Sequence, residues 1–133
     1  MHMRAQDIIK RTVHGVGAHR ITTRPSRRQV EVESSGEVVA VSGRAVELEE
    51  TGLLTRFYLP RDDIRMDLLT PSETTSHCPF KGDATYFSAL GSADAFWVYE
   101  APSEEDALAI AGLLAPWPGR VAVRVDGKPA QTR

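Results

Sequence analysis

The chain has 133 residues, of which 41% are hydrophobic, and 16 basic residues nearly balance 18 acidic ones. This size is typical of one domain with one core, and a net charge of −2 excludes a global field that would attract nucleic acid or an anionic membrane. The single cysteine, Cys78, excludes an internal disulfide framework and a zinc site built from several thiolates. We therefore expect a cytoplasmic protein, and the lack of a long apolar run argues against secretion and membrane insertion.

Residues 1–28 are predicted to form an N-terminal arm or a short helix. An apolar pair at Ile8 and Ile9 favours the helix, and a basic run from Arg20 to Arg28 follows it. A solvated arm is the simplest interpretation of that run, and a contact with a phosphate or a partner is the alternative.

Residues 29–127 are predicted to form a single β-rich domain, followed by a frayed tail at 128–133. Alternating apolar and polar residues, interrupted by short turn sequences, are typical of antiparallel hairpins. We predict three hairpins, formed by residues 29–33 with 37–41, 44–49 with 53–59, and 84–90 with 95–99. Between the second and third we expect a bend and a fifth strand over 61–69, and then a loop over 70–75.

One helix is predicted near residues 103–114. Ser103 is a suitable N-cap, acidic residues follow it, and apolar residues then recur at helical spacing up to Leu114. A final alternating segment at 120–125 precedes the turn sequence Asp126-Gly127. The sequence therefore predicts a mainly β domain with about eight short strands and one helix.

Cys78 and Lys81 are the candidate catalytic residues. A thiolate needs a nearby cation or base to become reactive, and Lys81 lies three residues after Cys78. His77 is a poor base for it, because neighbouring side chains of an extended segment point to opposite faces. The alternative for Cys78 is a small buried side chain without chemistry.

Aromatic residues near this turn could stack against a planar ligand. Tyr58, Tyr86, Trp97 and Tyr99 are concentrated there in the predicted hairpins, and core packing is the alternative for about half of the rings. The Lys81-Gly82 pair could present an ammonium and backbone donors to an anion, or could simply form a turn.

Metal chemistry has little support in the sequence. The histidines His14, His19 and His77 lack the spacing of metal ligands, and Asp62-Asp63 is better interpreted as a turn. We expect no metal and no cofactor.

Several short motifs together resemble a known bacterial family. They are Gly43-Arg44-Ala45, Tyr58-x-Pro60, Asp63-Ile64, Thr74-Thr75, Cys78-Pro79-x-Lys81-Gly82 with Tyr86, Ala95-x-Trp97-x-Tyr99 and Val123-x-Val125-Asp126-Gly127. In order and spacing they are similar to the domain of unknown function four-two-seven, sometimes labelled nucleotidyltransferase family nine. The resemblance implies two packed antiparallel sheets of the β-tent type.

The resemblance also has two points of disagreement. Zinc-bearing β-tent proteins use several cysteines, whereas this chain has one. Nucleotidyl transfer normally needs paired carboxylates after a glycine-serine turn, and no Asp-x-Asp or equivalent motif follows Gly91-Ser92. What the family contributes is a set of matching positions, namely Arg44, Tyr58, Thr75, Cys78, Lys81, Tyr86, Trp97 and Tyr99.

The leading hypothesis is a domain that binds a small planar or anionic ligand. Trp97, Tyr99 and Tyr58 would form an aromatic wall, Arg44 and Lys81 would meet an anionic end, and Thr75 and Tyr86 complete the site. An enzyme that uses Cys78 or Lys81 at the same site is the second hypothesis. A protein-interaction module or homodimer is the third.

Overall fold

The computed structural model describes residues 19–132, which form eleven strands in three antiparallel sheets. The strands are β1 (Ile21–Pro25), β2 (Val30–Ser34), β3 (Glu37–Ser42), β4 (Val46–Glu50), β5 (Arg56–Tyr58), β6 (Leu69–Cys78), β7 (Gly82–Ala89), β8 (Ser92–Val98), β9 (Leu114–Pro116), β10 (Ala122–Val125) and β11 (Lys128–Pro129). Three short 3-10 helices are η1 (Arg61–Asp63), η2 (Met66–Leu68) and η3 (Glu105–Ile110). The prediction of a mainly β domain is confirmed, and the strands outnumber the eight expected.

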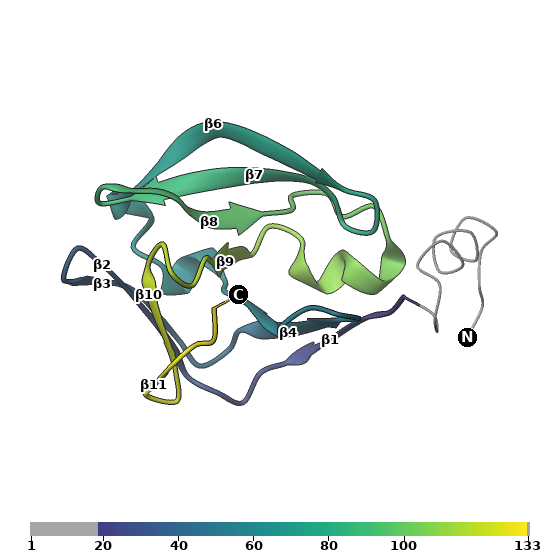
Figure 1. Cartoon of the computed structure of the whole chain (residues 1–133), viewed down its shortest axis with the longest axis horizontal. Helices are drawn as coiled ribbons and strands as arrows, with labels where there is room; N and C mark the ends of the chain where they lie inside the picture. Colours follow the sequence, from purple (N-terminus) through teal and green to yellow (C-terminus); the bar gives the residue numbers. More distant parts are fainter. Residues whose placement is uncertain (1–18, 133) are drawn as a thin grey trace.

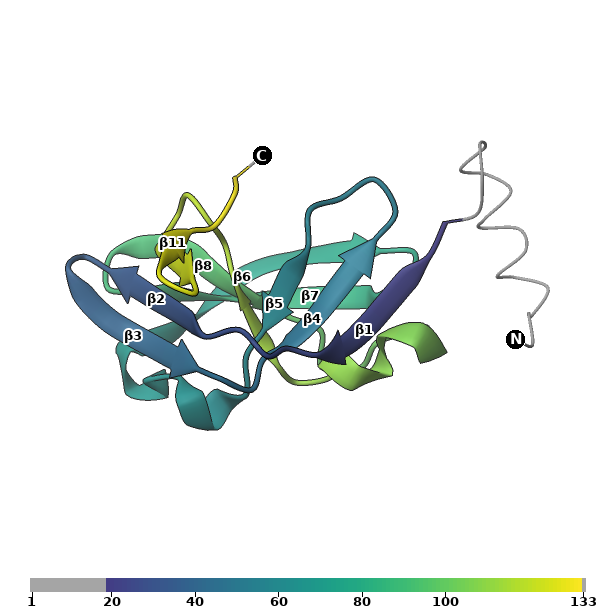
Figure 2. The same ribbon diagram turned by 90° about the horizontal axis from the view of Figure 1, so that it is seen from below.

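The three sheets form two layers. Their strand orders are β1-β4-β5, β11-β10-β2-β3 and β6-β7-β8-β9. The first two sheets lie side by side and together face the third (Figures 1 and 2). Two packed sheets were expected, and the structure has three, because one of the two layers is divided into two sheets. The division follows Pro25, which has no N–H for a ladder and ends β1 before the chain bends into β2.

The three predicted hairpins are confirmed. β2 pairs with β3, β4 with β5, and β7 with β8, all antiparallel. Ser35 and Gly36 have φ angles of 53° and 80°, and Leu90 and Gly91 have 44° and 88°. Positive φ at both central residues is the geometry that matches the twist of two-residue hairpins.

The prediction for residues 61–75 is wrong in its details. The structure has η1 and η2 where a bend and a strand were expected, and the ten-residue strand β6 covers the predicted loop. β6 lies at the edge of its sheet and pairs only with β7. Most of its side chains are polar and exposed, so the segment lacks the apolar alternation by which a strand is recognised.

The predicted helix near 103–114 is also shorter than expected. Residues Glu105–Ile110 form a 3-10 helix, whose N-cap residue, Glu104, makes no side-chain capping bond. Ala107 and Ile110, three residues apart, are the buried residues of the helix, which matches the period of three of 3-10 structure. Gly112, with φ of 74°, ends the segment before β9.

The ends of the chain are described only in part. The helix proposed for the N-terminal arm would lie outside the described residues, and the end of that arm forms β1, which pairs with β4. Within the predicted tail, β11 pairs with β10. None of the helices in residues 19–132 is long and apolar enough to cross a membrane.

Each half of the divided layer packs on the third sheet through its own apolar cluster. One cluster joins Val30, Val32 and Val39 to Phe96 and Val98. The other places residues of β4 and β5 against β7, β9 and η3, and its members are Ile21, Leu48, Tyr58, Phe80, Ala84, Tyr99, Ala107, Ile110 and Ala115. The second cluster is the floor of the candidate site.

Candidate functional site

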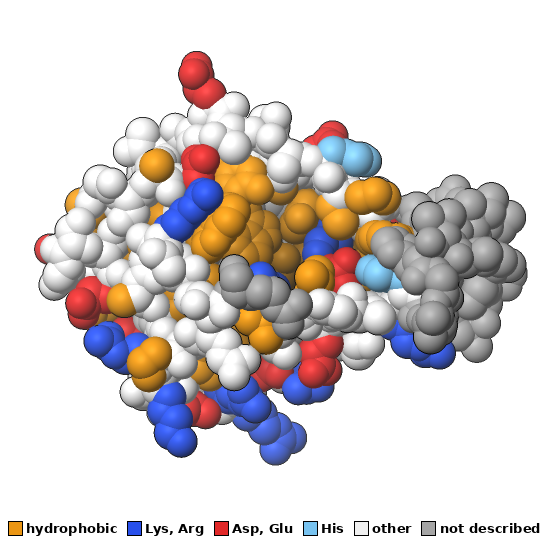
Figure 3. Space-filling model, viewed as in Figure 1, with side chains coloured by type: hydrophobic (Ala, Val, Ile, Leu, Met, Phe, Trp, Pro, Cys, Tyr) orange, Lys and Arg blue, Asp and Glu red, His pale blue; other side chains and the backbone are white. Residues whose placement is uncertain are grey.

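A cavity of about 270 Å³ opens between the β1-β4-β5 sheet and the β6-β7-β8-β9 sheet. Figure 3 shows hydrophobic side chains gathered in a hollow on this face, with basic, acidic and histidine side chains along one edge. The lining residues are Leu48, Glu50, Leu53, Leu54, Arg56, Tyr58, Lys81, Tyr86, Trp97, Tyr99 and Trp117.

Strand periodicity brings these residues to one space. On β4, Leu48 and Glu50 are two residues apart and share a face. On the neighbouring strand β5, Arg56 lies opposite Leu48, and Tyr58 shares the face of Arg56. The residues of β4 and β5 therefore form one wall of the cavity.

The opposite wall is aromatic. Tyr86 on β7 lies directly across from Trp97 on β8, so both rings share one face of the sheet. Trp97 and Trp117 meet edge to face with centroids 5.8 Å apart, and Tyr86 lies 6.3 Å from Trp117. These separations are typical of favourable aromatic pairs. Phe87 and Phe96, on the other face, pack with the first apolar cluster.

A hydrogen bond joins the two walls. Trp97 Nε1 donates to the hydroxyl of Tyr58 at 3.0 Å, and the rings meet edge to face with centroids 6.1 Å apart. Tyr58 is fully buried, and this burial raises its pKa well above the ordinary value. Burial raises the pKa of Tyr99 in the same way, so both phenols stay neutral at physiological pH.

A buried ion-pair network lies at one end of the cavity. The Lys81 ammonium donates to Glu50 Oε1, and Glu50 Oε2 lies 2.8 Å from His19 Nε2. Lys81 and Glu50 are 7% and 8% exposed, so little solvent screens the pair. His19 stacks on Phe80 with ring centroids 3.7 Å apart, and Lys81 Nζ lies 5.8 Å from the centre of the Tyr99 ring.

A tight turn between β6 and β7 holds Lys81 in this position. The N–H of Lys81 donates to the carbonyl of Cys78, and its carbonyl accepts from the N–H of Ser103. Gly82 follows with φ of 100°, and a Cβ there would lie 3.3 Å from both Ala101 O and Ser103 N. Glycine is needed because the backbone is left-handed and closely covered.

Arg56 supplies a second cation at the cavity. Its guanidinium carbon lies 5.8 Å from the centre of the Trp97 ring, which places the charge over the aromatic face. The side chain has no carboxylate partner among the described residues, whereas Lys81 is paired with Glu50.

Five of the residues singled out from the sequence converge on this cavity: Tyr58, Lys81, Tyr86, Trp97 and Tyr99. Three others lie elsewhere. Arg44 donates to both carboxylate oxygens of Asp63, at 3.0 and 3.1 Å, and this pairing holds the pKa of Asp63 below its usual range. Thr75 is exposed on β6, and Cys78 is half-buried and packs against the second apolar cluster.

Sequence reasoning missed Glu50, Arg56 and Trp117. Glu50 continues the β4 face that carries Val46 and Leu48, so strand periodicity could have identified it. Trp117 lies between Pro116 and Pro118, a pattern that indicates the end of a helix and gives no sign of a binding site. No local pattern in the sequence marks Arg56 as a site residue.

In residues 19–132, no three His, Cys, Asp or Glu side chains gather closely enough to hold a metal ion.

The comparisons with known proteins support the family resemblance. No curated protein matches the chain. A family model described as a domain of unknown function (DUF427) matches residues 22–127, which span all strands from β2 to β10 and most of β1. Since that match covers most of the sequence, the chain belongs to the DUF427 family.

Proposed function

We propose that this domain binds a small planar ligand in the aromatic cavity. The observation that carries the proposal is the union of an aromatic wall with a buried ion pair, Lys81 and Glu50, in one open cavity. Binding sites typically combine apolar walls with a few convergent polar groups. At about 270 Å³ the cavity suits one small ring system.

The polar groups favour a particular ligand edge. Lys81 is a donor, and Glu50, next to it, is an acceptor with lone pairs beyond those used by Lys81 and His19. A ring edge in which a carbonyl lies beside an N–H would satisfy both groups. Because the charges of Lys81 and Glu50 offset each other, this end of the cavity suits a neutral ring edge rather than an anion.

A thermal-shift assay with four planar probes tests this proposal. The probes are uracil, hypoxanthine, 2-pyridone and nicotinamide, and 1,3-dimethyluracil is the control that lacks both N–H groups. We expect at least one probe to raise the melting temperature of the wild type, because a ligand that binds only the folded state stabilises it. Dimethyluracil should not.

Two variants locate the response. Trp117→Ala removes part of the aromatic wall without touching the Trp97–Tyr58 hydrogen bond, and it should abolish the shift. Arg44→Met removes a cation outside the cavity, so this variant should show the same thermal shift as the wild type. No shift with any probe on the folded wild type, or an equal shift in Trp117→Ala, would contradict the proposal.

A further inference from the structure

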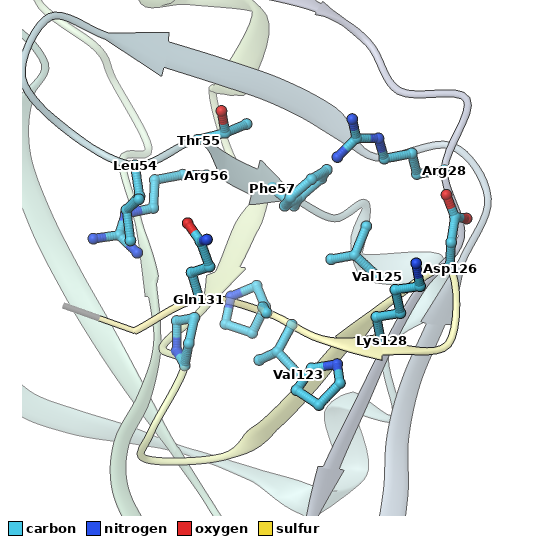
Figure 4. A pocket seen from close by; sticks show the side chains of 14 residues that line it. Arg28, Leu54, Thr55, Arg56, Phe57, Val123, Val125, Asp126, Lys128 and Gln131 are labelled. Carbon is cyan, nitrogen blue, oxygen red and sulfur yellow. The ribbon is translucent and has the colours of Figure 1, made fainter.

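A second, larger cavity adjoins the aromatic one. Its volume is about 520 Å³, and Leu54 and Arg56 line both cavities, so the two are neighbours across the start of β5. It lies between β5 and the β10-β11 end of the adjacent sheet. Figure 4 shows Leu54 and Arg56 on one side of this space, Arg28, Asp126 and Lys128 on the other, and Phe57 between them.

The charges that line the second cavity are unbalanced. Arg28, Arg56 and Lys128 are cations, and Asp126 is the one carboxylate among its described lining residues. Asp126 Oδ1 already accepts the backbone N–H of Gln29 at 2.9 Å. The cavity therefore has a surplus of positive charge.

These three cations lack carboxylate partners, whereas five of the ten arginines in residues 19–132 have one. Arg24, Arg44, Arg61, Arg65 and Arg124 each contact a carboxylate within 4.0 Å. No described carboxylate lies within that distance of the three cations of the cavity. Guanidinium groups without partners, set around a concave surface, are suited to bind an oxyanion through paired hydrogen bonds.

We infer that this cavity binds an anionic group, phosphate or carboxylate, of the same ligand whose planar part fills the aromatic cavity. The inference rests on the proposed function, because the shared residues Leu54 and Arg56 provide the connection between the two parts. It assigns the ligand to a class: a small ring system with an anionic substituent. In this arrangement Arg56 is placed between the ring and the anion.

Calorimetric titration of the folded protein with inorganic pyrophosphate, and separately with citrate, tests the inference. The variant pair is Arg28→Met with Lys128→Met, which removes two cations of the cavity. The matched control is Arg20→Met with Arg27→Met. It removes two exposed cations that lie near Arg28 in the sequence but do not line the cavity. Both double variants lose the same net charge.

We expect at least one of the two anions to bind the wild type and the control with similar affinity. Binding to the Arg28/Lys128 double variant should be weaker by about ten-fold or more, because charge-assisted hydrogen bonds are lost. A preference for pyrophosphate or for citrate identifies the group as phosphate or carboxylate. No binding of either anion to the wild type, or equal weakening in both double variants, would overturn the inference.

The planar probes separate this inference from the proposed function. The Arg28/Lys128 double variant should keep the thermal response to the planar probes, since neither residue lines the aromatic cavity. Loss of anion binding with intact probe binding supports the two-part site. Anion binding without any probe response would contradict the proposed aromatic function and the assignment of both parts to one ligand, and would leave an anion site alone.

Discussion

Trp97 Nε1 donates a hydrogen bond to the hydroxyl of Tyr58, and this 3.0 Å contact joins the two sheets across the candidate site. Each ring belongs to a different sheet, so neither could be positioned by its own hairpin alone. The contact adds a side-chain link between the cavity walls to the paired backbone hydrogen bonds of Leu59 and Leu114.

Replacing Tyr58 with phenylalanine should lower the free energy of unfolding by about 1 kcal/mol, because the Trp97 N–H loses its acceptor. Urea denaturation would measure the loss. Tyr86→Phe is the control: its hydroxyl contacts Ser76 at an exposed site, so its removal should cost less. Equal losses would show that the hydrogen bond to Trp97 adds no more stability than the exposed contact between Tyr86 and Ser76.

Lys81 and Glu50 should be strongly coupled. Lys81→Met leaves a buried carboxylate without its cation, and Glu50→Gln leaves a buried ammonium, so each should cost about 3 kcal/mol. The double variant should cost clearly less than the sum, because no unpaired charge remains. Additive losses in a urea denaturation cycle would exclude a tight ion pair.

Gly82→Ala should destabilise the domain by about 1–3 kcal/mol, since alanine is strained at a φ of 100° and its Cβ would press on two backbone atoms. Gly43→Ala is the matched control, because no atom lies within 4 Å of its added Cβ and its φ is not positive. Thermal unfolding of both variants checks this prediction. Similar melting temperatures would mean that the β6–β7 turn adapts freely.

Stability should fall at alkaline pH. The pKa of Tyr58 is raised by burial, so above its ordinary value of 10.0 the unfolded chain releases the proton while the folded protein keeps it. The free energy of unfolding therefore decreases with rising pH, by up to about 1.4 kcal/mol per pH unit for this group. Tyr58→Phe should show a shallower decrease in denaturation series up to about pH 11, and the remaining decrease includes Tyr99. Identical slopes would contradict a buried, neutral Tyr58.

The hairpins were predictable because their signals are local. Alternation in 30–33 and 37–41, together with Ser35-Gly36 between them, determines both the strands and the turn. β6 was not predictable, since its polar residues have no buried face and its pairing with β7 supplies the strand. The prediction of a helix over 103–114 was wrong in length and type, because apolar spacing that suits an α-helix also suits a shorter 3-10 helix.

Within the site, the sequence by itself determined that Tyr86, Trp97 and Tyr99 would be close together, because a single hairpin and its exit contain all three. It also placed Lys81 in the turn before them. Only the tertiary structure decided that Glu50 pairs with Lys81, that Trp117 completes the aromatic wall and that Arg44 forms an ion pair with Asp63. Such contacts join residues from different sheets and loops, and their partners are set by how the layers pack rather than by strand periodicity.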